Sequence, residues 1–470
     1  QKSNKNEPKL ELSYQNTNHQ DYLFILHEIG LLDNVQKPLN FGNRRLLKAH
    51  TFFLEQIENF DLPKLTKILN KINSSLIVKI EVNNHSDAFI LFESLNNRGI
   101  PLSAIDLIKN NILAELEKKK ILHIDEAFSH WKSLIENLTD DYTIQERFLR
   151  QYYNAFRYKN EIKVNIKGGT KATRSNLINI FDTLIERNVK FIFDDLCEKS
   201  TIYGNLIQVN NNLPNELNDL SRVGASPSYT FLLYLLSEHP NNKPLIKDSI
   251  NFLIKYFVRR NITDFPATRN LDAIFMGLID ECERRKESLS IDTISNYLTR
   301  SEHLQKIMIF EEKLRGNIYE DNPDMTRFIL TSIEENYYTK EHKPELWSRD
   351  DKNKFVWTIE HIFPEGENIP LEWVNVIGNG NKVQAKQIQK EIVHTLGNLT
   401  LTGYNSSLSN LSFDKKRDRK DPKGNFIGYK NNLYLNKELA QKNQWKKEDV
   451  QDRTNKLLKI LIEKFRLAAE

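Results

Sequence analysis

The sequence has 470 residues and contains only two cysteines, Cys197 and Cys282, which lie at neither a disulfide-framework nor a metal-binding CxxC spacing. No apolar run approaches the about 18 residues that a membrane-spanning helix needs, and the start shows no secretory-signal pattern. The first seventy residues contain no glycine-rich loop that could cradle phosphate. These absences exclude a disulfide-stabilised secreted protein and a membrane protein, and they predict a soluble protein of a reducing cytoplasm.

The net charge is also small, because 67 lysines and arginines are nearly balanced by 63 aspartates and glutamates and leave a formal net charge of +4. So small a net charge does not identify a nucleic-acid-binding protein. Basic residues do cluster in one place, at Lys415, Lys416, Arg417, Arg419, Lys420 and Lys423. Such a run is most often a solvated face, but its position directly after a candidate catalytic motif favours phosphate binding.

The length predicts two to four domains at about 100–200 residues each. Residues 121–350 read as successive amphipathic helices, for example "SYTFLLYLLSEH", joined by polar connectors. After the charged stretch "WSRDDKNK" the pattern changes to short strands. We therefore expect a mainly α chain with a small α+β C-terminal domain at residues 351–470.

The segment before residue 120 contains a predicted strand, "LIVKIEV" at 76–82, and then a helix, tight turn and helix in "FESLNNRGIPLSAIDLIKNNIL". Ser103 and Asp106 have the spacing of a capping box, and an apolar stripe follows them. The simplest interpretation is a turn at Asn96 and Arg98 followed by a capped helix. The alternative is that Asn96, Arg98 and Asp106 hold a ligand phosphate or a neighbouring loop.

The candidate catalytic motif begins with "KFVWTIEHIF", a strand pattern that ends at Glu360 and His361 and that Pro364 prevents from continuing. "GNLTLTGYN" predicts a second short strand, and "SSLSNLSFDKKR" predicts a helix over 406–417. Strand, strand and helix in this order form a scaffold that can hold one divalent metal ion between a strand end and a helix start.

Phosphodiester hydrolysis needs a base to take a proton from water and a cation to offset the charge that develops on the phosphate. His361 can be the base, Glu360 and Asn405 offer the oxygen ligands that magnesium prefers, and Asn398 can fix the geometry of His361. Taken singly, the Glu-His pair is weak evidence and both asparagines could be turn residues. Zinc is less favoured, because His361 and His394 have no cysteine or histidine partners at ligand spacing.

The ordered motifs "IEHIFPE", "HTLGNLTLTGYNSSLSN" and "FDKKR" resemble the HNH, or His-Me finger, domain of GmrSD-type modification-dependent restriction endonucleases and related SspE-type phage-defence proteins. The resemblance covers about residues 351–470 and implies a ββα-metal nuclease. It implies His361 as general base, Glu360 and Asn405 as ligands of Mg²⁺ or Mn²⁺, Asn398 as the residue that orients the finger, and Lys416 near a phosphate. Glu365 replaces the family's usual glutamine, and residues 366–390 read as an insertion-like loop.

Residues 1–120 resemble the later part of the ParB-like sensor and NTPase domain of the same proteins, and this implies nucleotide binding by Asn96, Arg98 and Asp106. The family's earlier Asp-Gly-Gln-Gln-Arg motif is absent from the sequence. We therefore expect NTP to be a cofactor only if the full protein contains that motif.

Two hypotheses follow. The first is a magnesium-dependent endonuclease of a restriction or anti-phage system that cleaves foreign double-stranded DNA, in particular modified phage DNA. This hypothesis allows the protein to form a homo-oligomer. The alternative is a DNA- or partner-binding defence protein with an NTP-driven sensor and an inactive or regulated finger.

Overall fold

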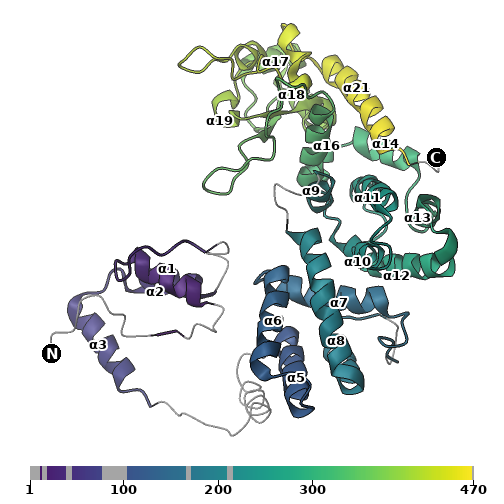
Figure 1. Ribbon diagram of the computed structural model, residues 1–470. Coiled ribbons are helices and arrows are strands. Elements are labelled where there is room, and N and C mark those ends of the chain that lie inside the picture. The colour runs from purple at the N-terminus through teal and green to yellow at the C-terminus, as the bar shows by residue number, and fades with distance from the viewer. Residues whose placement is uncertain are drawn as a thin grey trace. The chain divides into compact units, whose positions relative to one another are not determined.

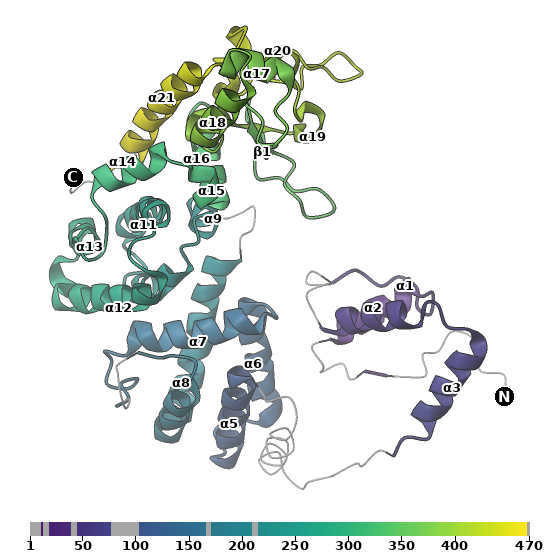
Figure 2. The same ribbon diagram turned by 180° about the vertical axis from the view of Figure 1, so that it is seen from behind.

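The computed structural model describes residues 11–12, 18–38, 45–76, 103–165, 171–208 and 215–467. These residues are mainly helical and form one small two-stranded sheet (Figures 1 and 2). The prediction of a mainly α chain with a small amount of strand is confirmed. Contacts divide the chain into two compact units, residues 1–209 with 232–238 and residues 210–231 with 239–470. Within the described ranges, no helix is long and apolar enough to cross a membrane.

The described part of the first unit contains helices and their connections but no strand. Its helices are α1 (His19–Glu28), α2 (Arg45–Ile57), α3 (Leu62–Asn73), α5 (Ala104–Lys118), α6 (Ile124–Leu138), α7 (Tyr142–Phe156), α8 (Leu177–Ile207) and most of α10 (Tyr229–Glu238). Helix α5 packs against α6 and α8 through a buried stripe formed by Ile105, Ile108, Ile112 and Leu116. Ser103 is the N-cap of α5. Its hydroxyl accepts a hydrogen bond from the Asp106 amide at 3.3 Å and donates one to the Asp106 carboxylate at 2.5 Å. The predicted cap and stripe are confirmed.

The second unit begins with a helical part. Its helices are α9 (Asn215–Arg222), η1 (Ser226–Ser228), the start of α10 (Tyr229–Glu238), α11 (Lys243–Thr263), α12 (Thr268–Arg284), η2 (Lys286–Ser288), α13 (Ile291–Leu298), α14 (Ile307–Arg315), α15 (Ile318–Asp321) and α16 (Pro323–Glu335). Apolar residues recur at helical spacing, and Phe257 and Phe275 stack in parallel with ring centroids 6.0 Å apart. These helices match the amphipathic pattern of the sequence.

The sheet lies in the C-terminal part of the second unit. Strands β1 (Thr358–His361) and β2 (Leu399–Thr402) pair antiparallel, with Glu360 opposite Thr400 and His361 opposite Leu399. The remaining elements are α17 (Leu371–Gly378), α18 (Lys382–Ile392), η3 (Leu396–Asn398), α19 (Asn405–Leu408), α20 (Phe413–Arg417), η4 (Tyr434–Asn436), η5 (Leu439–Gln441) and α21 (Lys447–Phe465). They enclose an aromatic core in which Trp373 and Trp445 are almost completely buried.

Two elements near the sheet differ from the sequence prediction. The strand predicted in "KFVWTIEHIF" ends at His361 as expected, but it begins only at Thr358, and Phe355 instead bridges to Arg349. The predicted helix over 406–417 is broken into α19 and α20, because Ser409 between them has a φ of +40° that an α-helix does not accept.

The prediction of an insertion-like loop at 366–390 is wrong, since helices α17 and α18 occupy most of it. Trp373, Val374 and Ile377 lie at helical spacing, and their burial against the C-terminal core makes the helix favourable. Gly378 allows α18 to approach, because a Cβ at this position would lie 2.8 Å from the Ala385 Cβ. Two further predictions, the strand at 76–82 beyond Leu76 and the turn at 96–99, lie outside the described residues.

Candidate active site

The end of strand β1 places two predicted residues on opposite faces of the sheet. Successive side chains of a strand point to opposite faces. Glu360 therefore points into the core and is 3% exposed, whereas the adjacent His361 lies at the other face. Just after His361 the backbone is attached to the end of η3, directly before β2, since the Ile362 amide donates to the Asn398 carbonyl at 2.9 Å.

His361 forms a cluster with two aromatic neighbours. Its Nε2 lies 3.2 Å from Nδ1 of His394, so one of these nitrogens donates and the other accepts. The Tyr319 ring meets His361 edge-on at a centroid distance of 4.8 Å and stacks on His394 at 5.7 Å. On the other side, Nδ1 of His361 lies 3.6 Å from a carboxylate oxygen of the largely exposed Glu365. These contacts define both the plane and the position of the imidazole.

Burial, and then the neighbouring His394 and Lys416 charges, lower the pKa of His361 to about 3. The imidazole is therefore neutral at neutral pH and has a lone pair that can accept a proton.

Asn398 is completely buried and connects three segments. Its Oδ1 accepts from the Phe363 amide at 2.8 Å, and its Nδ2 donates to the carbonyls of Phe363 and Val393, both at 2.9 Å. The loop that leaves β1 after His361 is thereby joined to the segment that carries His394. This geometry is compatible with the predicted orienting role of Asn398.

Helix α21 holds η3 in place. Arg453, a completely buried residue of α21, donates to the Gly397 and Leu399 carbonyls at 2.7 Å each, and these carbonyls flank Asn398. The Thr454 hydroxyl accepts from the Gly397 amide at 3.0 Å. The approach is so close that a Cβ at residue 397 would lie 2.0 Å from the Val450 carbonyl oxygen, which explains the glycine. Burial lowers the pKa of Arg453 to about 10, so the guanidinium stays charged at neutral pH.

Glu360 and Lys416 form a buried ion pair, which the sequence did not predict. Lys416 Nζ donates to Glu360 Oε1 at 2.6 Å, to the His361 carbonyl at 2.8 Å and to the Ile362 carbonyl at 3.2 Å. All three ammonium hydrogens are used, and Lys416 is 0% exposed. The sequence predicts that Lys416 approaches a phosphate, but the structure places it in the core, because it compensates the buried Glu360 carboxylate. Burial raises the pKa of Glu360, and Lys416 opposes that shift.

Asn405 begins α19 and is attached to the same strand as the histidine. Its Nδ2 donates to the Ile359 carbonyl at 2.8 Å, two residues before His361. This bond orients the half-buried amide and leaves its oxygen without a hydrogen bond among the described residues. Asn405 therefore fits a hard cation, whereas the Glu360 carboxylate does not fit one while Lys416 holds it. No cluster of three or more His, Cys, Asp or Glu side chains that could hold a metal ion occurs in the described ranges.

Comparison with known families gives two matches. A family model described as GmrSD restriction endonucleases, C-terminal domain, matches residues 304–460. A second, described as GmrSD restriction endonuclease, N-terminal domain, matches residues 1–113. The chain belongs to the GmrSD-type restriction endonuclease family. Among curated proteins, none matches the chain. Membership of the family implies a restriction endonuclease that acts on DNA.

The GmrSD C-terminal match includes the whole site and also α15, which carries Tyr319. The boundaries predicted at residues 120 and 350 stay predictions. In the N-terminal match, Asn96 and Arg98 lie outside the described residues. Asp106 is described, and there its carboxylate accepts a hydrogen bond from Ser103, the residue that caps α5.

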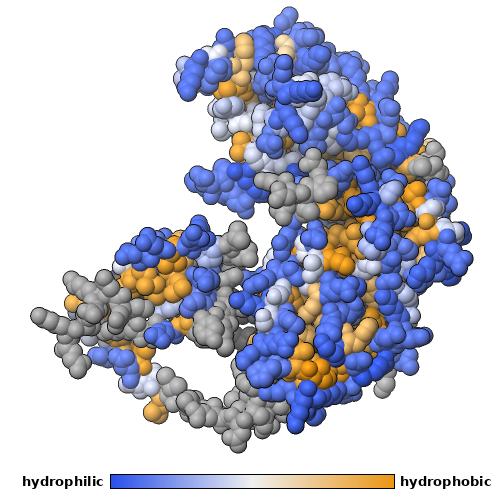
Figure 3. Space-filling view, in the orientation of Figure 1, coloured by the Kyte–Doolittle hydropathy of each residue, from blue (hydrophilic) through white to orange (hydrophobic). Residues whose placement is uncertain are grey.

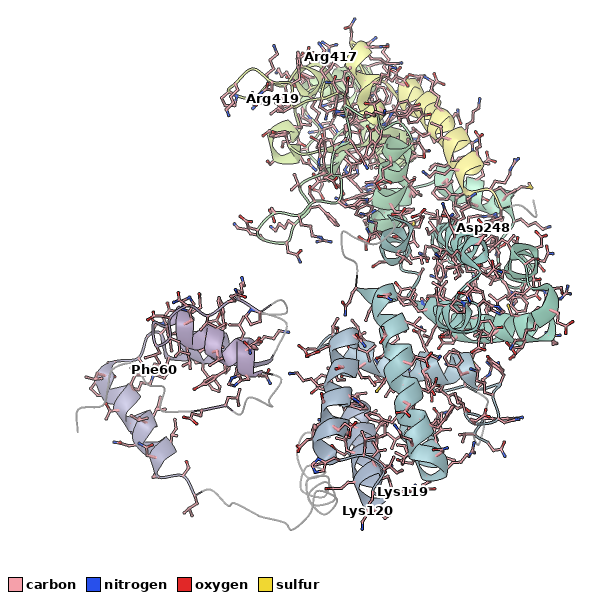
Figure 4. All side chains as sticks on the ribbon, viewed as in Figure 1. Phe60, Lys119, Lys120, Asp248, Arg417 and Arg419 are labelled. Atoms are coloured by element: carbon pink, nitrogen blue, oxygen red, sulfur yellow. The ribbon has the colours of Figure 1, made fainter. Side chains whose placement is uncertain are left out.

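The basic patch divides into buried and exposed members. Arg417 donates to the Lys442 carbonyl at 2.6 Å and pairs with Asp418, so it stabilises the fold. Arg419 lies in the hairpin that follows α20 (Figure 4), and together with Lys415, Lys420 and Lys423 it is exposed. Lys415 lies 3.8 Å from a carboxylate oxygen of Glu372, so Arg419, Lys420 and Lys423 are the members that keep their charge available to an anion.

Sequence reasoning missed three residues that hold the site together, namely Tyr319, His394 and Arg453. His394 stands only four residues before Asn398 in the motif itself, which was a usable signal. Tyr319 and Arg453 are far away in sequence, and only the tertiary fold brings them to the site.

Proposed function

We propose that this GmrSD family member is a metal-dependent DNA endonuclease of a restriction and defence system, with a ββα-metal site and His361 as general base. The observation that carries the proposal is the neutral His361, which His394 and Tyr319 hold at the end of β1 on the strand that also anchors Asn405. A preoriented neutral imidazole beside an oxygen donor is what water activation next to a hard cation requires.

In the proposed mechanism, Nε2–H of His361 donates to Nδ1 of His394, which leaves Nδ1 of His361 with its lone pair. This nitrogen takes a proton from the attacking water. The Glu365 carboxylate, 3.6 Å from Nδ1, then stabilises the imidazolium that forms. The negative charge of bound DNA acts in the same direction and raises the pKa of His361 from its low value.

Magnesium, or manganese in its place, is proposed as the cofactor, with the Asn405 amide oxygen as ligand. When bound, the ion would offset the negative charge that develops on the phosphate. Glu360 would join Asn405 only after release from Lys416, so its predicted ligand role depends on a rearrangement of the buried pair.

The substrate is proposed to be foreign double-stranded DNA, in particular phage DNA that carries a modification, and the N-terminal region is proposed as the sensor. The missing Asp-Gly-Gln-Gln-Arg motif leaves Asn96, Arg98 and Asp106 without a complementary set of donors for a triphosphate, whose charge needs neutralisation from several directions. We therefore propose that nucleotide binding by residues 1–470 is weak.

The test is cleavage of modified and unmodified phage DNA by the wild type and His361→Ala, with magnesium, with manganese or with a chelator. We expect metal-dependent cleavage that His361→Ala reduces by about 10²–10⁴-fold without loss of DNA binding. The matched control is His130→Ala, an exposed histidine of α6, which should cut normally. Cleavage by His361→Ala at the wild-type rate would contradict the assignment of the base.

The buried Glu360–Lys416 pair favours a second candidate, a DNA- or partner-binding defence protein whose finger is inactive or regulated. Specific DNA binding without cleavage of any DNA under any metal condition would support this candidate over the endonuclease.

A further inference from the structure

Two short segments on either side of the catalytic motif in sequence share a pattern. They are "RDDKNKF" at 349–355 and "KDPKGNF" at 420–426. Each begins with a basic residue, continues with aspartate, has lysine at the fourth position and ends with phenylalanine. We call them the first and the second hairpin.

The two hairpins also share their backbone hydrogen bonds. In the first, the Asp350 amide donates to the Lys354 carbonyl at 2.8 Å, and the Asp350 carboxylate accepts from the amides of Lys352 at 3.0 Å and Lys354 at 2.8 Å. In the second, the Asp421 amide donates to the Asn425 carbonyl at 2.9 Å. The Asp421 carboxylate accepts from the amides at 423 and 425, at 2.9 and 2.8 Å.

The first and last residues close each hairpin in the same way. Arg349 forms an antiparallel bridge with Phe355, and Lys420 forms one with Phe426. Each cation lies over the ring of its partner, at 3.8 Å for Arg349 and 4.5 Å for Lys420. The fifth residue has a positive φ in both, +60° at Asn353 and +86° at Gly424. The segments are thus two copies of one turn structure that presents a lysine at its corner.

The charges at the corners are available. Lys352 and Lys423 occupy the equivalent fourth position, both are exposed, and neither ammonium group has an ion pair or hydrogen bond within the described part of the chain. The aspartate at the second position is used by the turn. Lys354 and Arg419 add exposed positive charge beside the corners, and the exposed Asp351 is the opposing charge in the first hairpin.

Both hairpins belong to the second unit and extend from the same side of it, with α19 between them in the two opposite views (Figures 1 and 2). Their surfaces are hydrophilic (Figure 3). Helix α19 begins with Asn405, which is attached to the strand of His361. Two exposed cationic turns therefore lie on either side of the element that leads into the candidate active site.

We propose that the two hairpins are a pair of phosphate-binding arms that contact the backbone of double-stranded DNA on both sides of the bond to be cleaved. This inference rests on the proposed nuclease function and adds to it how the substrate is held. Contacts of lysine with phosphate carry no sequence information, so the arms position any duplex and leave selection to other parts of the chain.

The arms are tested by binding in the presence of chelator, which separates them from catalysis. Lys352→Ala, Lys423→Ala and the double variant are compared with Lys313→Ala/Lys459→Ala, which removes two exposed lysines of α14 and α21. Each lost phosphate contact lowers the slope of log affinity against log salt by about 0.9. DNA affinity falls when salt is raised from about 50 to 200 mM. We expect this fold decrease to be smaller than that of the wild type by a factor of about 3.5 in each single variant and about 12 in the double variant. The control double variant should keep the wild-type slope.

Interference by phosphate ethylation on one duplex then tests the placement of the arms. We expect Lys352→Ala to lose contacts on one side of the cleavage position and Lys423→Ala to lose contacts on the other. Wild-type slopes in the double variant, or loss of the same phosphates in both single variants, would overturn the proposal. Because each substitution removes an exposed side chain whose ammonium group has no ion pair or hydrogen bond within the described residues, the backbone bonds of the turns should remain and circular dichroism should be unchanged.

Hydrolysis of bis(p-nitrophenyl) phosphate separates the failure of this inference from that of the proposed function. This small ester needs the catalytic residues but no arms, so the double variant should cleave it at the wild-type rate and cleave DNA more slowly at high salt. A wild type that cleaves neither ester nor DNA contradicts the nuclease, while the binding slopes still decide about the arms.

Discussion

Replacement of Lys416 by methionine distinguishes the role predicted from the sequence from the one found in the structure. Lys416→Met keeps most of the side-chain volume but removes the ammonium group that compensates the Glu360 carboxylate. Breaking a buried ion pair by removing one partner costs about 3–5 kcal/mol, because a charge remains buried without compensation. The carbonyls of His361 and Ile362 lose their hydrogen bonds as well. Such a loss is a large fraction of the about 5–15 kcal/mol that stabilises a typical protein.

The assay is hydrogen exchange followed by mass spectrometry of a peptide that contains β2, since exchange from a core strand reports the free energy of opening. We expect this free energy to fall by about 3–5 kcal/mol in Lys416→Met. The double variant Glu360→Met/Lys416→Met should recover most of the loss, because an apolar pair of similar volume is often as stable as a buried ion pair. The control is Lys415→Met, which changes an exposed neighbour and should stay within about 0.5 kcal/mol.

The reasoning is refuted if Lys416→Met opens no more easily than Lys415→Met and at the same time lowers the salt slope of DNA binding by about 0.9. Lys416 would then contact phosphate, as the sequence predicts, and the buried pair would not be the arrangement that matters in solution.

Three further predictions concern residues around His361. His394→Ala should lower kcat about 10–100-fold with little change in KM for DNA, because it releases a partner that orients the base; an unchanged kcat would show that His361 needs no such support. Asn398→Ala should destabilise the β1 end by about 2–4 kcal/mol through three lost buried hydrogen bonds, seen as faster exchange of β2 peptides; exchange at the wild-type rate would exclude its connecting role. Asn405→Ala should cut DNA slowly and recover partly at raised magnesium, whereas residual cleavage that survives a chelator would rule out a metal ligand at this position.

The sequence predicted the helical architecture well, because helical periodicity and capping are local signals. The cap of α5 at Ser103 is an example, since both partners lie within one turn. The prediction from the sequence was wrong at residues 366–390. The helical spacing of Trp373, Val374 and Ile377 was present there, but the segment was interpreted as an insertion-like loop. The break at Ser409 could not be read locally, since serine has no strong preference for a positive φ.

The roles of the site residues were harder to predict than their positions. The motif order identified Glu360, His361, Asn398 and Asn405, and the structure shows the hydrogen bonds of the last three, whereas their catalytic roles stay predictions. A linear motif does not say which member of a pair faces the core. His394 and Arg453 were missed because their contacts depend on how α21 and the segment after α18 pack.

The alternation of side chains along a strand could have anticipated the difference between Glu360 and His361. Two successive residues of β1 cannot both point to the same face of a flat strand, so an acid and a base that are neighbours in sequence are separated in space. Here Glu360 lies on the face that packs against the core. Burial of a carboxylate in the core is costly unless a cation pairs with it, and Lys416 is that cation. The carbonyls of His361 and Ile362 bind the same ammonium group, so the charge pair fixes the backbone at the point where His361 leaves the strand. The acid of the motif thus supports the base through the backbone in the arrangement described, and any ligand role for Glu360 must come with a change in the position of Lys416.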